Sequence, residues 1–146
     1  MTKNEMTERF IALIKSKITA LNSVFSAEDV MPDTLTHAQY PAAAVEITHT
    51  ITGFQNPTIL ACDVSVILLN RSWKDIKGKV AIEELNTLMR SFRTNIATFY
   101  SLSNSLGADK TQAFGVLTDE NAPQRLPTEQ FIYSAELLYS IEFDSL

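Results

Sequence analysis

The chain has 146 residues, the usual length of one domain, and 45% of them are hydrophobic, which is enough to fill a core. Its formal net charge of −5 argues against broad nucleic-acid binding driven by charge alone. A single cysteine, Cys62, excludes an internal disulfide framework and a multi-cysteine metal site. We therefore expect a single domain over residues 1–146.

The first predicted element is a helix over residues 2–22, because apolar side chains recur along one face at helical spacing. Its stripe consists of Phe10, Leu13, Ile14, Ile18 and Leu21. Residues 22–41 have no clean period and contain two prolines, which predicts a loop.

Two strands are predicted next, over residues 42–51 and 58–69, joined by turn-forming residues in the manner of a hairpin. The second strand is apolar on both faces near its end, which favours a central position in the sheet. A second helix is predicted over residues 80–100. Its buried stripe consists of Ile82, Leu85, Met89, Phe92, Ile96 and Phe99.

A short strand over residues 112–118 and a loop over residues 119–128 precede the closing segment, QFIYSAELLYSIEF, at residues 130–143. Every second residue of this segment is apolar, and those between are mostly polar. This alternation predicts one strand with a dry face and a wet face, much longer than the usual strand of about 5–6 residues. We expect Phe92 and Ile96 to pack on its inward row, which consists of Leu137, Tyr139 and Ile141.

These elements follow the order α-β-β-α-β-β. They predict an α+β domain of two layers, an antiparallel sheet of about four strands with two helices packed on one face.

The sequence offers little catalytic chemistry. The glycines are scattered singly, so no phosphate-binding loop can form from them. His37 and His49 are too few for a typical histidine-rich metal site, and surface or hydrogen-bonding roles are favoured for both. Cys62 is a possible nucleophile with His49, but a buried apolar role is favoured. Asp63 and Glu46 are a possible carboxylate pair, although a strand's wet face also requires polar residues. We expect no enzymatic activity, no cofactor and no metal.

The segment between the second strand and the second helix is basic and holds the only tryptophan. We predict an interface there, formed by Arg71, Trp73, Lys74, Lys77 and Lys79. Tryptophan and arginine are enriched at interface hot spots, whereas lysine is depleted. Trp73 has two main interpretations, an interface contact or a lid on the core. Stacking on nucleic acid is a third.

Charge is unevenly distributed along the chain. Residues 70–100 carry six basic and three acidic side chains, a net charge of +3, and residues 101–146 carry two basic and seven acidic ones, a net charge of −5. Such a charge distribution would let copies of the subunit bind head to tail. The alternative is that these charges simply belong to a normally solvated surface. Residues 1–9 are polar and no apolar run approaches about 20 residues, so we expect no signal peptide, no membrane span and synthesis in the cytoplasm.

In its organisation the chain resembles the tail terminator, or tail-completion, proteins of long-tailed bacteriophages and prophages, such as the lambda minor tail protein U group and related Mu-like proteins. The similar segments are the opening helix ERFIALIKSKITAL, the proline-led strand YPAAAVEI, the second helix AIEELNTLMRSF and the closing strand FIYSAELLYSIEF.

The resemblance implies a structural protein that caps the tail tube as a ring, typically a hexamer, and offers a surface to the head. It implies three partners: further copies of the chain, the tail tube protein and the head–tail connector protein. No sequence-specific contact with nucleic acid is implied, though DNA can pass through such a ring. It places the protein in the host cytoplasm during assembly and then in the virion tail, and it carries over no catalytic residue. The alternative is a small cytosolic α+β domain that binds a ligand or catalyses a reaction in an apolar pocket, as a dimer.

The resemblance also suggests a reason for the long closing strand. An unpaired edge or a protruding end of this strand can meet the neighbouring subunit.

Overall fold

A computed structural model of the protein describes residues 3–29, 39–52, 59–72, 77–100, 113–126 and 131–143. His37, Trp73 and Lys74 lie outside the described residues, as does the predicted turn between the first two strands.

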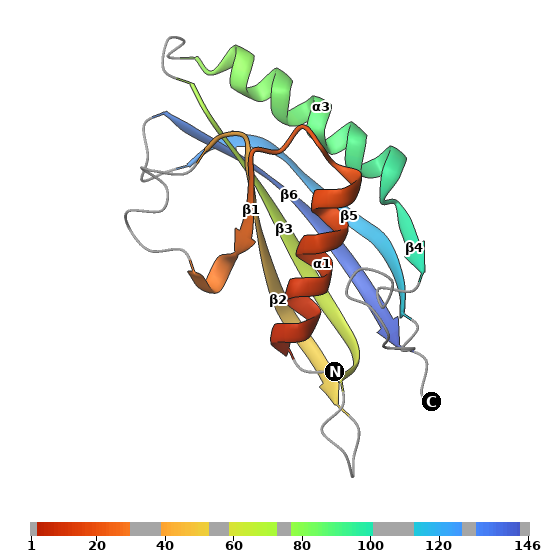
Figure 1. Ribbon diagram of the computed structural model, residues 1–146. Coiled ribbons are helices and arrows are strands. Elements are labelled where there is room, and N and C mark those ends of the chain that lie inside the picture. Colours follow the sequence, from red (N-terminus) through yellow and green to blue (C-terminus); the bar gives the residue numbers. More distant parts are fainter. Residues whose placement is uncertain are drawn as a thin grey trace.

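The described residues form two α-helices, a short 3-10 helix and six strands (Figure 1). In chain order they are α1 (Lys3–Lys17), β1 (Ser23–Ser26), η1 (Ala27–Asp29), β2 (Ala42–Thr52), β3 (Ile59–Arg71), α3 (Lys79–Asn95), β4 (Thr98–Tyr100), β5 (Ala113–Arg125) and β6 (Ile132–Phe143). This arrangement confirms the predicted α+β class.

The sheet differs from the prediction in strand number and direction. Six strands lie in the order β1-β2-β3-β6-β5-β4, and β1 runs parallel to β2, so the sheet is mixed. The four long strands are the predicted ones and are antiparallel neighbours. The two additional strands are short edge strands, and they change the chain order to α-β-β-β-α-β-β-β. Four residues and three residues are too few to show a period of two, so neither strand could be predicted from its pattern.

The closing strand β6 lies inside the sheet, hydrogen-bonded to β3 on one side and β5 on the other. Both of these neighbours are 13 residues long. The prediction that this strand has an unpaired edge for a neighbouring subunit is therefore wrong, whereas the alternative, a protruding end, stays a prediction. Its unusual length matches the two long strands between which it is paired.

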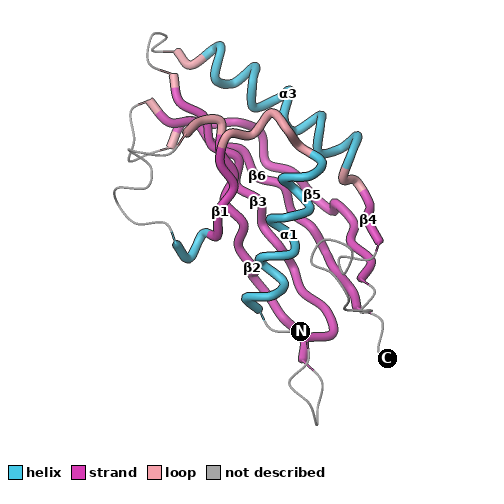
Figure 2. The backbone as a smooth tube through the Cα atoms, in the orientation of Figure 1, coloured by secondary structure: helices cyan, strands magenta, loops and turns pink. Residues whose placement is uncertain are grey.

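Both helices pack on one face of the sheet (Figure 2). The hydrophobic core on that face contains buried residues from α1, α3, β2, β3 and β6. The phenyl ring of Phe10 meets the ring of Tyr139 edge to face at 5.3 Å between centroids, which ties α1 to β6. Phe92 and Ile96 are fully buried in the same core as the inward row of β6, as predicted.

Element boundaries shift where tertiary contacts override the local pattern. The first helix ends at Lys17 and the second at Asn95, each five residues earlier than predicted. After α3 the chain pairs Thr98–Tyr100 with β5, and these β-branched and aromatic residues suit a strand. The predicted loop over residues 119–128 is largely strand, because β5 continues to Arg125.

The start of α3 is fixed by contacts to the ends of β3 and β6. Gly78 precedes the helix with a φ of 65°, and the ring of Tyr133 occupies the space that a Cβ would need. The side-chain amide of Asn70, which is buried, donates a hydrogen bond of 2.6 Å to the Glu84 carboxylate on α3. Within the described part of the chain, no helix is both long enough and apolar enough to cross a membrane.

Candidate functional site on the second face of the sheet

The second face of the sheet is the face opposite α1 and α3. Because successive strand residues point to opposite faces and paired residues share a face, Ser65 and Ile67 of β3 lie on it beside Glu136 and Leu138 of β6. The residues on either side of them in sequence, Val64, Val66, Leu137 and Tyr139, belong to the core beneath the helices.

One end of the second face is apolar. Ala42, Leu69 and Ile132 are buried there and are packed by Phe25, Tyr40, Ile67 and Leu126. Ile132 is 2% exposed, so at this end the closing strand is buried even on the face that the alternation predicts to be exposed to solvent. The Arg71 guanidinium lies 5.6 Å from the centroid of the Tyr40 ring, within cation–π range, beside this apolar cluster.

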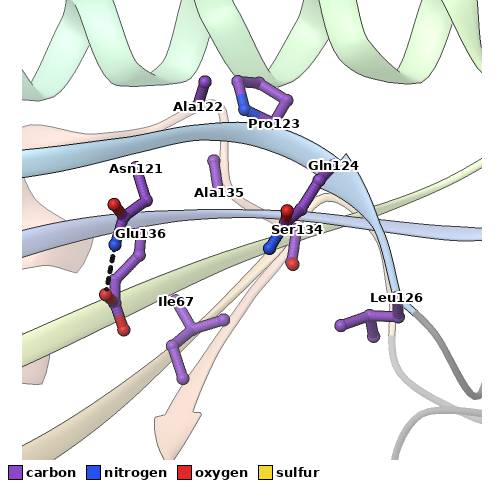
Figure 3. Close-up of a pocket in the computed structure, with 9 residues that line it drawn as sticks. All are labelled: Ile67, Asn121, Ala122, Pro123, Gln124, Leu126, Ser134, Ala135 and Glu136. Atoms are coloured by element: carbon purple, nitrogen blue, oxygen red, sulfur yellow. Dashed lines mark hydrogen bonds between the residues drawn. The ribbon is translucent and has the colours of Figure 1, made fainter.

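Next to the apolar end is an open pocket of about 500 Å³. It is lined by Ile67, Asn121, Ala122, Pro123, Gln124, Leu126, Ser134, Ala135 and Glu136 (Figure 3).

A bulge in β5 creates one wall of this pocket. Asn121 pairs with Glu136 and Gln124 pairs with Ser134, so three steps along β5 match two steps along β6. In a regular strand, residues 121 and 124 would point to opposite faces, whereas the extra residue turns both toward the second face. Pro123 sits in the bulge, where its missing N–H costs no ladder hydrogen bond.

Among the described residues, Glu136 is the only charged one that lines the pocket. Its Oε2 accepts a hydrogen bond of 2.7 Å from the Ser65 hydroxyl, and its Oε1 accepts one of 2.8 Å from the Asn121 amide. Ser65 is 2% exposed and lies on the neighbouring strand, so the half-buried carboxylate is held from both sides. Two oxygens have about four lone-pair sites, of which these donors use two, so the carboxylate can still accept donors from a ligand.

The possible Cys62–His49 pair does not form. His49 is paired in register with Asp63, whereas Cys62 is paired with Thr50 and is 2% exposed in the core. Burial, with a smaller contribution from the charge of Asp63, raises the pKa of the Cys62 thiol to about 12. The thiolate needed for nucleophilic attack is therefore scarce near neutral pH.

Glu46 and Asp63, the possible carboxylate pair, are both exposed. Their neighbours in register are Ser65 and His49, all on the second face. Among the described residues, no three His, Cys, Asp or Glu side chains are grouped so that they could hold a metal ion.

Of the five residues of the predicted basic interface, the structure describes Arg71, Lys77 and Lys79. Lys77 and Lys79 are exposed at the start of α3, on either side of Gly78. Arg71 is half-buried and lies over Tyr40 at the apolar end of the second face. Trp73 and Lys74 lie between these positions in sequence and outside the described residues.

The sequence pattern does not reveal this pocket. Glu136 falls on the predicted wet face of the closing strand, and a single carboxylate on such a face carries no signal of its own. Asn121 and Gln124 fall in a predicted loop because of the nearby prolines. The signal that could have found them is the proline inside a polar stretch beside a long strand, which also suits a bulged edge strand.

Comparison with known proteins does not assign the chain to a family. No family model matches the sequence, and no curated protein matches it.

Proposed function

We propose that this protein is a structural component of phage tail assembly that caps the tail tube as a ring and provides the surface joined by the head. Its partners are further copies of the chain, the tail tube protein and a head–tail connector protein. The ring is a hexamer in this proposal, and DNA passes through it without sequence-specific contacts. Assembly takes place in the bacterial host cytoplasm, and the protein then stays in the virion tail.

The second face of the sheet is the observation that best supports this proposal. Both helices cover the other face, while the second face carries an apolar end next to an open pocket. Half-exposed apolar side chains beside fixed polar groups are typical of surfaces that bind another protein. A ring requires this kind of surface, because each subunit presents one patch to the neighbour on one side and a different patch to the neighbour on the other.

The edges of the sheet also suit a closed assembly. At one edge, β4 pairs only with residues 114–116 of β5. The rest of β5 contains two register shifts and Pro123. At the other edge, β1 has only four residues. Edge strands that are short, bulged or contain proline disfavour pairing with the edge strands of other copies. Subunits would then contact one another through side chains, and such contacts can form a closed ring.

The test is the mass of the purified protein in solution, measured over a range of concentrations with and without the tail tube protein. Electron microscopy of the same samples follows. We expect one closed oligomer with six copies of the chain, seated at the end of tubes when tubes are present. A protein that stays monomeric or dimeric in both conditions, and does not bind tube ends, would contradict the proposal.

A second candidate function is supported by the pocket around Glu136. An open pocket of about 500 Å³ with apolar walls and one oriented carboxylate falls within the range of small-molecule sites. In that case the chain is a small ligand-binding domain that acts as a dimer. Two results would favour this function over the ring. The protein would form dimers that never bind tail tubes, and it would bind a small cation saturably.

A further inference from the structure

The Glu136 carboxylate lies in the pocket with both of its oxygens held by neutral donors. The Ser65 hydroxyl donates to Oε2 at 2.7 Å, and the Asn121 amide donates to Oε1 at 2.8 Å. Among the described residues, none forms an ion pair with Glu136, and no basic side chain lines the pocket. Within this part of the chain the negative charge is fixed in direction but not neutralised, and it favours a cation as the occupant of the pocket.

The donor set of the pocket suits an organic cation better than a metal ion. Calcium takes about six to eight oxygen ligands, and magnesium is usually held by carboxylates together with phosphates and water. Glu136 is the only charged residue among the described ones that line the pocket, and no group of three metal-ligating side chains occurs in the described part of the chain. An organic cation needs only one carboxylate, because its own N–H groups donate the hydrogen bonds.

The walls beside Glu136 suit a short aliphatic chain. Ile67, Pro123 and Leu126 line the pocket with apolar side chains (Figure 3). All three are half-buried, so a ligand can cover the apolar surface that they still expose. A pocket of about 500 Å³ with apolar walls and a few placed polar groups has the usual character of a small-molecule site.

A second polar group lies elsewhere in the same pocket. Ser134 is two residues before Glu136 on β6, so both side chains are on the second face, and it is paired in register with Gln124. Figure 3 shows Ser134 and Gln124 together, apart from the pair formed by Glu136 and Asn121. Ser134 is 9% exposed, and no described residue hydrogen-bonds to its hydroxyl or to the Gln124 side chain. A neutral polar group of a ligand can therefore bond at this end.

We propose that the pocket binds a small primary alkylammonium ion, with its ammonium group on Glu136 and a neutral polar group at the far end of its chain on Ser134 and Gln124. An ammonium group supplies three donors, so it can bond the lone pairs that Ser65 and Asn121 leave on the carboxylate. The aliphatic chain lies along the apolar walls between the two ends. The inference names the ligand class of the second candidate function and rests on it, whereas the proposed ring does not depend on it.

The test compares 4-amino-1-butanol with 1,4-butanediol, in which a hydroxyl replaces the ammonium group. Each is titrated into the isotope-labelled protein, and the NMR shifts of backbone amides in β5 and β6 report binding. We expect saturable binding of the amino alcohol with a dissociation constant at least ~tenfold lower than that of the diol, because hydrogen bonds between charged groups are the stronger ones. n-Butylamine, which lacks the far hydroxyl, should bind about threefold more weakly than the amino alcohol.

A variant of Glu136 assigns the preference to the carboxylate. Glu136→Gln removes the charge and keeps an oxygen for Ser65 or Asn121, so it should bring the amino alcohol and the diol to the same affinity. Asp119→Asn is the matched control, because Asp119 is exposed on β5 outside the pocket lining, and it should leave the preference unchanged. The amide spectrum shows whether each variant is folded, and the comparison of ligands on the wild type needs no variant.

Four results would overturn the inference in different ways. Equal affinity of the wild type for amino alcohol and diol overturns the assignment of a cation and leaves a neutral small-molecule pocket. A preference that survives Glu136→Gln in a folded protein overturns the site at Glu136. Equal affinity for the amino alcohol and n-butylamine overturns the role of Ser134 and Gln124. Absence of binding by every ligand overturns the second candidate function together with this inference, and oligomer mass decides the ring separately.

Discussion

At the scale of single residues, Gly78 shows how one position can control an element boundary. Its φ of 65° is a conformation that side-chain-bearing residues adopt only at a cost, and the Tyr133 ring fills the space beside its Cα. We expect Gly78→Ala to lower the free energy of unfolding by about 2 kcal/mol or more, since backbone strain and a steric clash act together.

Urea unfolding measures this loss. Val80→Ala is the matched control, because Val80 is exposed in the first turn of the same helix and should change stability by less than about 0.5 kcal/mol. Equal stability of the Gly78→Ala variant and the wild type would show that Tyr133 does not pack on this glycine.

Two buried groups, Cys62 and Tyr139, should make the free energy of unfolding vary with pH in the alkaline range. Burial raises the pKa of Cys62 from 9.0 to about 12, and burial, with a smaller contribution from Glu120, raises the pKa of Tyr139 above its ordinary value of 10.0. A group with a raised folded-state pKa stabilises the fold fully below its unfolded-state pKa, and this contribution is lost as pH rises toward the folded-state value.

The free energy of unfolding should therefore fall above about pH 9, by at most about 1.4 kcal/mol per pH unit for each group. Urea melts at several pH values measure the slope. Cys62→Ala should flatten it between about pH 9 and 10, before Tyr139 contributes. A variant with an unchanged slope would show that the thiol is not buried. In the native protein the thiol should also resist alkylation near neutral pH.

At the scale of elements, the core depends on the contact between α3 and β6. Phe92 is fully buried and lies in the same hydrophobic core as Leu137 and Tyr139. Phe92→Ala should lower the free energy of unfolding by about 3–5 kcal/mol, because it removes a buried ring and leaves a cavity. The exposed Arg90 on the same helix supplies the control, Arg90→Ala. A loss below about 1 kcal/mol in denaturant melts would contradict the packing of Phe92 in the core.

Long periodic elements could be predicted from sequence, and short or irregular ones could not. The alternation of β6 correctly identified Tyr133, Leu137 and Ile141 as buried, because a period of two sustained over 12 residues is typical of a strand and of no helix. The end of α3 was misplaced because Ile96 and Phe99 continue its apolar stripe, although the chain turns at residue 96 and pairs with β5 instead. Strand pairing is a non-local contact, and local periodicity does not report it.

The pocket could not be predicted for the same physical reason. It depends on Ser65, Asn121 and Glu136, which come from three strands and meet only after the sheet has formed. The bulge that turns Asn121 toward Glu136 is an irregularity in strand register. A pattern of alternating residues cannot show such an irregularity when a proline already suggests a loop.

At the scale of the whole molecule, the two sides of the sheet carry different features. The second face carries the pocket and the apolar end, and the start of α3 carries the exposed lysines. Arg71 belongs to the second-face side through its contact with Tyr40. In the proposed ring, each side of the subunit would contact a different neighbour.

The remaining prediction concerns Trp73, which the sequence places between Arg71 on one side and Lys77 on the other. We expect it to act between molecules, because a tryptophan in a polar segment supplies affinity that nearby charges cannot, while those charges set orientation and association rate. Trp73→Ala should leave the melting midpoint within a few degrees of the wild type and should weaken ring formation and tail joining. Lys74→Glu should act mainly on the association rate and on its dependence on salt.

Arg71→Glu serves as the contrasting variant, because loss of the contact with Tyr40 should lower the melting midpoint as well as affect assembly. Thermal melting and oligomer mass, measured on the same samples, separate the two effects. A large drop in the melting midpoint for Trp73→Ala would identify Trp73 as a lid on the core.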